Sequence, residues 1–105
     1  MGGLQLQPLT ELVGVRAVGE VNITNRTAWE GTLAELPSTP SDPPVVHLEL
    51  AELTSVDAGG AAAVAAVAQR LAPEGRVVLH DPPRALTRIL EVLWPGTAGI
   101  EVSSS

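Results

Sequence analysis

The stretch Leu48–Gly60, LELAELTSVDAGG, is the most informative part of this chain. It begins as an apolar strand, reaches an Asp followed by an Ala and two glycines, and continues into a run of alanine and valine residues. A strand that turns directly into a helix presents the free N–H groups of the first helical turn at the edge of a sheet. The stretch is therefore both a signal of an α/β fold and a candidate docking point for an anion or a protein.

The residues after this stretch predict a helix over residues 58–71. Asp57 is well placed as its N-cap, because an Asp side chain accepts hydrogen bonds from the N–H groups of a first helical turn. Most positions in the helix are alanine, so we expect it to approach a sheet closely and to present a smooth outer face. Its expected inner face consists of three larger apolar residues at helical spacing, Val64, Val67 and Leu71.

Before this unit, the sequence predicts two strands and a helix. Alternating residues over 4–7 and an apolar run over 13–21 predict an antiparallel hairpin. Thr27 and Glu30 fit a capping box, and the apolar residues at helical spacing after it are Trp29, Leu33 and Leu36. Residues 37–44 contain four prolines in eight positions, so we expect a stiff loop there.

After this unit, the sequence predicts one more helix between strands. Apolar strands are expected over 45–50, in the centre of the sheet, and over 76–79. A helix led by Asp81 and two prolines follows, since proline is tolerated in a first helical turn. Its apolar stripe is Leu86, Ile89, Leu90 and Leu93. A last strand over 100–102 completes the pattern.

The order of these elements, β-β-α-β-α-β-α-β, predicts an α/β fold. We expect a single domain over residues 1–105, with a mixed sheet of four to five strands, three helices packed on it and a short tail at 103–105. The chain is long enough for one core. With 45% hydrophobic but only 2% aromatic residues, that core must consist mainly of Val, Leu, Ile and Ala.

Composition narrows the classes of partner. The net charge is −6, with six Arg and no Lys, which disfavours nucleic acid and anionic lipid as partners. No signal peptide is recognisable, and no apolar run is long enough to span a bilayer, so we expect a cytoplasmic protein without membrane insertion. Cysteine is absent, which excludes disulfides and thiolate metal sites.

No catalytic or cofactor site emerges from the motifs. His47 and His80 are expected on neighbouring strands, but two histidines make an incomplete zinc site, so we predict no metal and no cofactor. Gly59 and Gly60 lack the Lys of a phosphate-binding loop, and close packing against the sheet is the simpler reason for them. No serine stands in a nucleophile motif. We therefore expect a protein that is not an enzyme.

Three segments together resemble the STAS domain of bacterial anti-sigma-factor antagonists. Gly19-Glu20-Val21-Asn22 is similar to the family's Gly-Glu-Leu-Asp at the end of its second strand. Leu48–Gly60 is similar to its strand-plus-switch segment, which typically ends in Asp-Ser-Ser-Gly. Residues 77–93, a strand followed by a proline-led amphipathic helix, are similar to its closing unit. The segments occur in the family's order and spacing over residues 4–102.

The chain also departs from that pattern. Ala58 stands at the position of the phosphorylated Ser or Thr, and Gly59 at that of the second hydroxyl residue, so no phosphate acceptor is present there. Thr54 and Ser55 are the nearest hydroxyls, and we interpret them as polar residues at a strand end. Asn22 replaces a frequent Asp. Many members carry a further C-terminal helix, which is not evident here and whose absence would leave apolar surface open.

The resemblance implies a signalling module that regulates transcription by binding a protein. The expected partner is an anti-sigma factor or a related serine-kinase-like regulator, bound without phosphorylation control. The partner-binding residues carried over from the family are Asn22, Thr24, Asp57, Ala58, Gly59, Gly60 and Asp81. Two alternatives remain open: an accessory subunit of a membrane transport ATPase, and a sensor of a small lipid or nucleotide. Whether the protein is a monomer or a dimer is also open.

Overall fold

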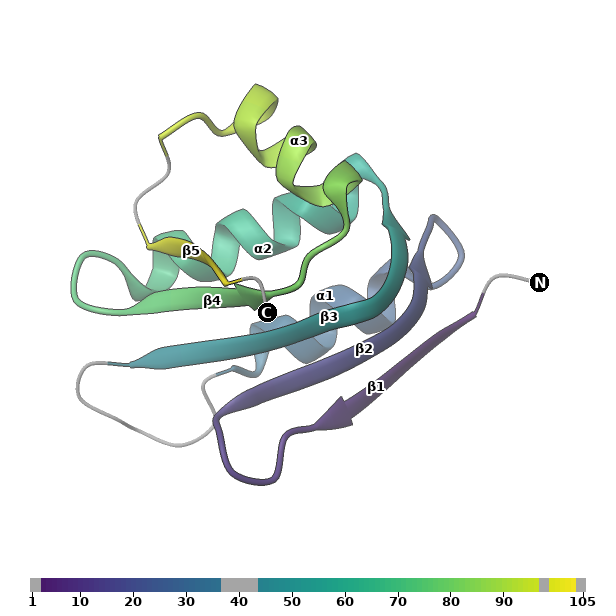
Figure 1. Ribbon diagram of the computed structural model, residues 1–105, viewed down its shortest axis with the longest axis horizontal. Coiled ribbons are helices and arrows are strands. Elements are labelled where there is room, and N and C mark those ends of the chain that lie inside the picture. Colours follow the sequence, from purple (N-terminus) through teal and green to yellow (C-terminus); the bar gives the residue numbers. More distant parts are fainter. Residues whose placement is uncertain (1–2, 37–43, 97–98, 104–105) are drawn as a thin grey trace.

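The computed structural model describes residues 3–36, 44–96 and 99–103, and it contains the predicted order of elements (Figure 1). The five strands form one sheet in the order β1-β2-β3-β4-β5. β1 is antiparallel to β2, and the other three pairings are parallel. The elements are β1 (Leu4–Pro8), β2 (Gly14–Val21), α1 (Arg26–Ala34), β3 (Val45–Val56), α2 (Ala58–Leu71), β4 (Arg76–His80), α3 (Arg84–Leu93) and β5 (Ile100–Ser103).

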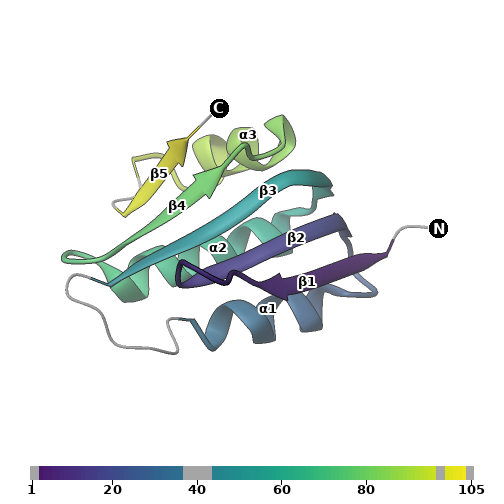
Figure 2. The ribbon, with the colours of Figure 1, turned by 60° about the horizontal axis from the view of Figure 1, so that its bottom comes forward.

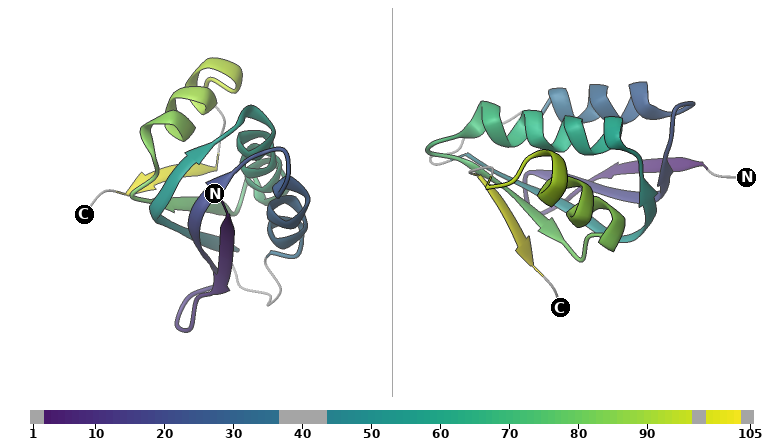
Figure 3. Two further views of the ribbon diagram at one scale, coloured as in Figure 1. Left: turned by 90° about the vertical axis from the view of Figure 1, so that its right-hand side faces the viewer. Right: turned by 90° about the horizontal axis from the view of Figure 1, so that it is seen from above.

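The three helices gather on one side of a twisted sheet (Figure 3). Each is the crossover between two parallel neighbouring strands, and right-handed crossovers place successive helices on the same face. Figure 2 shows the sheet from the side without helices, so that the strands lie in front and the helices behind them. We call the helix-packed side the covered face and the opposite side the open face.

The covered face carries the hydrophobic core. Its largest fully buried side chains come from every layer of the fold: Trp29, Leu33, Leu48, Leu50, Leu79 and Leu86. Valines and alanines fill the remaining space, as the composition predicts. Burial of so many aliphatic groups is the main stabilising term, because each fully buried side chain of this kind contributes about 1.5–3 kcal/mol.

β3 is longer than the sequence pattern predicts. We expected a strand over 45–50, but it continues to Val56. The pairing with β2 shifts register twice, between Arg16 and Val18 and between Gly19 and Glu20. At such bulges an extra residue on one strand breaks the two-residue alternation of apolar side chains. The sequence therefore no longer reads as a strand there, although the backbone pairing continues.

The second half of β3 extends past its neighbour β4. β4 pairs only with the stretch Val45–Glu49, so the following residues of β3 pair with β2 alone. In Figure 1 this part of β3 curves up toward the start of α2. The consequence is that the β3–α2 turn lies beyond the end of β4, where β3 has β2 as its one neighbouring strand.

Two details of the helices correct the sequence analysis. The predicted capping box is wrong: α1 begins at Arg26 with Asn25 as N-cap and no side-chain cap bond, so Thr27 already lies inside the helix. Leu93, predicted on the inner face of α3, is 53% exposed. It is the last residue of α3, beyond Leu86 and Leu90, which are the buried residues of that helix. The proline-rich loop falls largely on residues 37–43, which lie outside the described residues, as do 104–105 of the predicted tail.

Candidate functional site

The start of α2 is fixed by the Asp that the sequence singled out. Asp57 has extended backbone angles, and its side-chain Oδ1 accepts a 2.8 Å hydrogen bond from the backbone N–H of Gly60. Its own N–H donates to the carbonyl of Val21 at the end of β2, at 3.3 Å. The predicted cap is confirmed, and α2 spans the predicted residues. The cap ties the helix to two strands at once.

The loop between β2 and α1 lies beside this cap and is held by its own polar side chains. Asn22 Oδ1 accepts a 2.9 Å hydrogen bond from the N–H of Thr24. Asn25 Oδ1 accepts from the N–H of Asn22, and Asn25 Nδ2 donates to the carbonyl of Glu20, both at 2.9 Å. Such bonds between short polar side chains and nearby backbone stabilise turns. The loop therefore presents a defined shape.

Arg26 joins this loop to the start of α2. Its guanidinium Nη1 lies 3.8 Å from Asp57 Oδ2, and its Nε lies 3.5 Å from Glu30 Oε1. The side chain also covers Gly59, where an added Cβ would lie 2.3 Å from Arg26 Nη1. Gly59 thus leaves the room that Arg26 occupies.

Gly60 is buried beneath the same corner of the fold. A Cβ there would lie 2.6 Å from Cγ1 of Val56 and 2.9 Å from Cγ1 of Val21. Its carbonyl accepts a 3.0 Å hydrogen bond from the indole Nε1 of the buried Trp29. Both glycines therefore serve close packing, as the sequence analysis favoured. A docking protein can touch their surroundings, but Gly60 itself is covered.

The surface formed by the start of α2 and the β2–α1 loop includes exposed apolar residues, one of which the sequence analysis missed. Ala58 is the exposed first residue of α2, and Ile23 projects from the neighbouring loop with 78% of its surface exposed. Among the described residues, Ile23 is the most exposed of the large hydrophobic side chains. The signal was present in the sequence, because an Ile between polar turn residues has no core to join.

Comparison with known proteins identifies the family. A family model described as "Mlab, STAS domain" matches residues 5–94, which is most of the chain. The chain belongs to the STAS domain family. The solved structure of the anti-sigma factor antagonist SpoIIAA in its unphosphorylated form matches this fold with a TM-score of 0.56 and 16% sequence identity. The match covers 96% of this chain and 88% of that one. No curated protein matches the sequence.

Asp81 lies apart from the other predicted site residues of this STAS domain. It follows His80, which pairs with Glu49 in the first half of β3, whereas Asp57 follows the end of that strand. Asp81 instead lines a polar hollow of about 240 Å³ on the open face, together with Arg16 and Glu49. It adopts a left-handed backbone conformation with φ of 50°, uncommon for a residue with a side chain.

The apolar groove of the STAS domain lies between α3 and β5. It has a volume of about 430 Å³, and its apolar lining includes Leu90, Trp94, Ile100 and Val102. This is the surface on which the small-molecule alternative would depend. No helix in the described ranges is long and apolar enough to cross a membrane.

Proposed function

We propose that this STAS domain is a non-catalytic interaction module that binds a kinase-like anti-sigma factor, or a related regulator, in the cytoplasm. Its docking surface consists of Asn22, Ile23, Thr24, Asp57 and Ala58, with the two glycines beneath. The observation that carries the proposal is the exposed Ile23 on the β2–α1 loop, which Val21 and Arg26 join to the exposed start of α2. An exposed apolar side chain within a polar rim is typical of a protein interface.

The proposed interaction lacks a phosphorylation switch. Phosphoserine at the position of Ala58 would add close to two negative charges beside Asp57. Alanine cannot accept a phosphoryl group, so the charge of this surface stays constant. A partner that is expelled by a phosphoserine in other members would remain bound here. Control of the interaction would then come from the amount of either protein or from the partner's own ligands.

A charge substitution tests this surface directly. Ala58→Glu introduces a carboxylate at the start of α2, where a partner would have to desolvate it next to Asp57. We expect binding to weaken about tenfold or more, since a misplaced charge in an interface costs more than about 1.4 kcal/mol. The matched control is Ala66→Glu, an exposed alanine of the same helix away from the docking surface. Pull-down from host lysate with mass spectrometry is the readout.

A second pair of variants tests the apolar centre. Ile23→Ser should reduce capture of the same partner, because a central apolar anchor contributes much of an interface's energy. Val92→Ser, on the solvent side of α3 and 69% exposed, should not. Capture of a kinase-like anti-sigma factor by the wild type and the two controls alone would support the proposal.

The other outcomes separate the alternatives. Capture of a transport ATPase through the same surface would favour an accessory subunit. Equal capture of a partner by Ala58→Glu and the wild type would contradict the proposed docking surface. Phosphorylation of the wild-type protein at Thr54 or Ser55 by the captured kinase would contradict the absence of a switch.

A further inference from the structure

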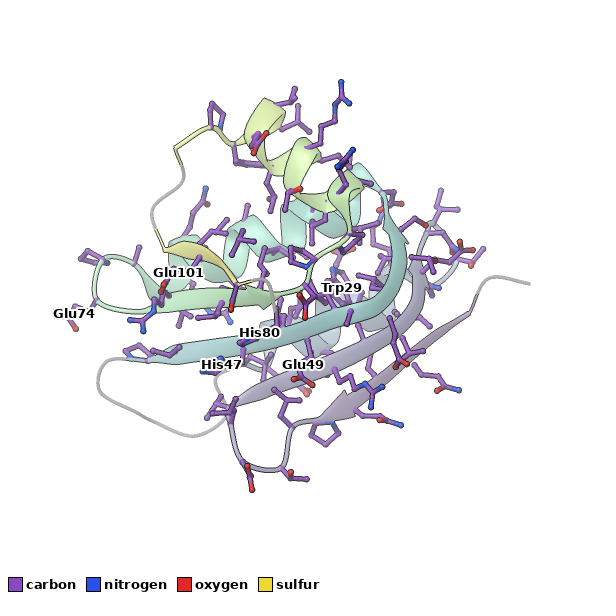
Figure 4. All side chains as sticks on the ribbon, viewed as in Figure 1. Trp29, His47, Glu49, Glu74, His80 and Glu101 are labelled. Carbon is purple, nitrogen blue, oxygen red and sulfur yellow. The ribbon has the colours of Figure 1, made fainter. Side chains whose placement is uncertain are left out.

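The open face of the sheet brings together the two histidines of the chain. His47 lies on β3 and His80 on the adjacent β4 (Figure 4). His47 Nδ1 lies 2.9 Å from His80 Nε2, and the ring centroids are 5.2 Å apart. This separation is that of a hydrogen bond between two ring nitrogens. One nitrogen therefore carries a hydrogen, and the other accepts it with its lone pair.

The register of the sheet gives the two rings different neighbours. His47 pairs with Gly14 on β2 and with Val78 on β4, so neither of its direct neighbours is charged. Val78 is apolar and only 9% exposed. His80 instead pairs with Glu49, an acidic residue on the adjacent strand. Because a nearby opposite charge favours the charged form and an apolar environment disfavours it, a positive charge is favoured on His80 and opposed on His47.

The other charged groups around the pair come from all the neighbouring strands. They are Arg16 on β2, Glu52 on β3, Arg76 on β4, Glu101 on β5 and Asp81 directly after His80. Arg16 forms an ion pair with Glu52, and Arg76 forms one with Glu101. Burial lowers the pKa of His47 below its ordinary value of 6.5, and His80 and Arg76 lower it further. The surroundings of the pair therefore resist a charge on His47.

The chemistry of the two rings sets the order in which protons bind. When His80 Nε2 donates to His47 Nδ1, the free lone pair of the neutral pair is on His80 Nδ1. A first added proton binds there and leaves the hydrogen bond intact, with a charged and therefore stronger donor. The remaining lone pair is then His47 Nδ1, which lies inside the hydrogen bond. A second proton can bind there only if the two nitrogens separate, since two N–H groups cannot face each other at 2.9 Å.

We propose that His47 and His80 form an acid-sensitive switch on the open face, in which His80 Nε2 donates to His47 Nδ1 and a second positive charge separates the rings. In the neutral and the singly charged pair, the hydrogen bond joins the side chains of β3 and β4. Uptake of the second proton removes this contact. The switch lies on the open face and does not depend on the proposed docking surface.

The switch links the stability of the fold to pH. In the unfolded chain both histidines take up protons near pH 6.5, whereas the folded chain resists the second proton. Below that pH the unfolded chain therefore binds more protons than the folded one, and acid favours unfolding. The stability contributed by the pair is present above about pH 6.5 and is lost as the pH falls toward the lowered pKa of His47.

Nitrogen-15 NMR of the imidazole rings tests the assignment in the unmodified, tag-free protein, because it reports which ring nitrogens carry hydrogen. At pH 8, His47 should have a bare Nδ1 and His80 a protonated Nε2. During titration to pH 4.5, His80 should become charged first, and His47 should follow about one pH unit or more below it. The reverse placement of the hydrogen, or charging of both rings at the same pH, would overturn the proposal.

Two carboxylate variants test why His80 is charged first. Glu49→Gln removes the acidic residue in register with His80, so His80 should become charged at a lower pH than in the wild type. Glu74→Gln removes an exposed carboxylate in the turn before β4 and is the matched control, which should titrate like the wild type. Equal titration of His80 in the two variants would contradict the assigned order of protonation.

Urea unfolding at pH 7.5 and at pH 5.0 tests the consequence for stability. The urea midpoint of the wild type should fall on acidification, and that of His47→Gln should fall less, because the variant has no second histidine to charge. Carboxylates that titrate over the same range are common to both proteins, so the difference between the two falls isolates the pair. An equal fall in the two proteins, or a larger one in the variant, would overturn the proposal.

Discussion

The two faces of the sheet are made by alternate residues of the same strands, yet they obey different constraints. On the covered face, Leu48 and Leu50 of β3 are completely buried under the helices. On the open face, Glu49 lies between them in sequence and is exposed. His47, also on the open face, is half-buried, and its ring contacts the ring of His80. Packing alone determines the first face. Charge and polar contacts determine the second.

The difference shows where this fold can acquire a function without losing stability. Interior packing is close to that of a crystal, so covered residues have few acceptable replacements. The open face holds two ion pairs, Arg16–Glu52 and Arg76–Glu101, whose members are about half exposed. Val78 is an exception on the open face, because it is apolar and shielded from solvent although it is not part of the core cluster.

The largest expected effect contrasts two neighbours on β3. Leu48→Ala removes a fully buried side chain and leaves a cavity, so it should lower the free energy of unfolding by about 2–5 kcal/mol. Glu49→Ala changes an exposed residue and should shift it by less than about 0.5 kcal/mol. Urea unfolding followed by tryptophan fluorescence measures both.

These two measurements can contradict the view that the open face contributes less to stability than the covered face. A loss of more than about 2 kcal/mol for Glu49→Ala would mean that the open face is covered in solution, for example by a second copy of the chain. Repeating the measurement at several protein concentrations would detect such an association, because it makes apparent stability depend on concentration.

The covered face was largely predictable from the sequence, and the open face was not. Apolar periodicity placed α2 at its observed residues and put Val64, Val67 and Leu71 inside. It failed over the second half of β3, where bulges interrupt the alternation. Periodicity reports which residues avoid water. It carries no information on how polar side chains on different strands meet.

In the candidate site too, local interactions were predictable from the sequence and contacts between distant elements were not. The cap at Asp57 was predictable because it is a local interaction within four residues of chain. The contact between Arg26 and the start of α2 was not, since it joins two elements distant in sequence. Asp81 was expected at the same corner, but the limited overlap of β4 with β3 places it elsewhere.

A smaller contrast concerns the two sides of the helices. Gly60 faces the sheet, where a Cβ would overlap Val56, whereas Gly31 on α1 has nothing within 4 Å of the added carbon. Gly60→Ala should destabilise the protein by about 1–3 kcal/mol through overpacking. Gly31→Ala should stabilise it by about 1 kcal/mol, because alanine favours a helix interior.

The same glycine-to-alanine change should therefore lower the free energy of unfolding at position 60 and raise it at position 31. Thermal unfolding of both variants, with the double variant as a check on additivity, provides the measurement. The two sites share no contact in the structure, so their effects should add to within about 0.5 kcal/mol. Stabilisation by Gly60→Ala would show that α2 does not approach the sheet as closely as described.

The smallest expected effect lies on the open face, in the ion pair between Arg16 and Glu52. Their side chains are 45% and 54% exposed, so a double-mutant cycle with Gln at both positions should yield a coupling of only about 0.2–1 kcal/mol. The coupling should shrink in 1 M NaCl, where screening acts over about 3 Å. The pair Arg76–Glu101, equally exposed, is the matched control and should behave alike. A coupling above about 1.5 kcal/mol that resists salt would show that this ion pair is shielded from solvent, and the open face would then contribute to stability much as the covered face does.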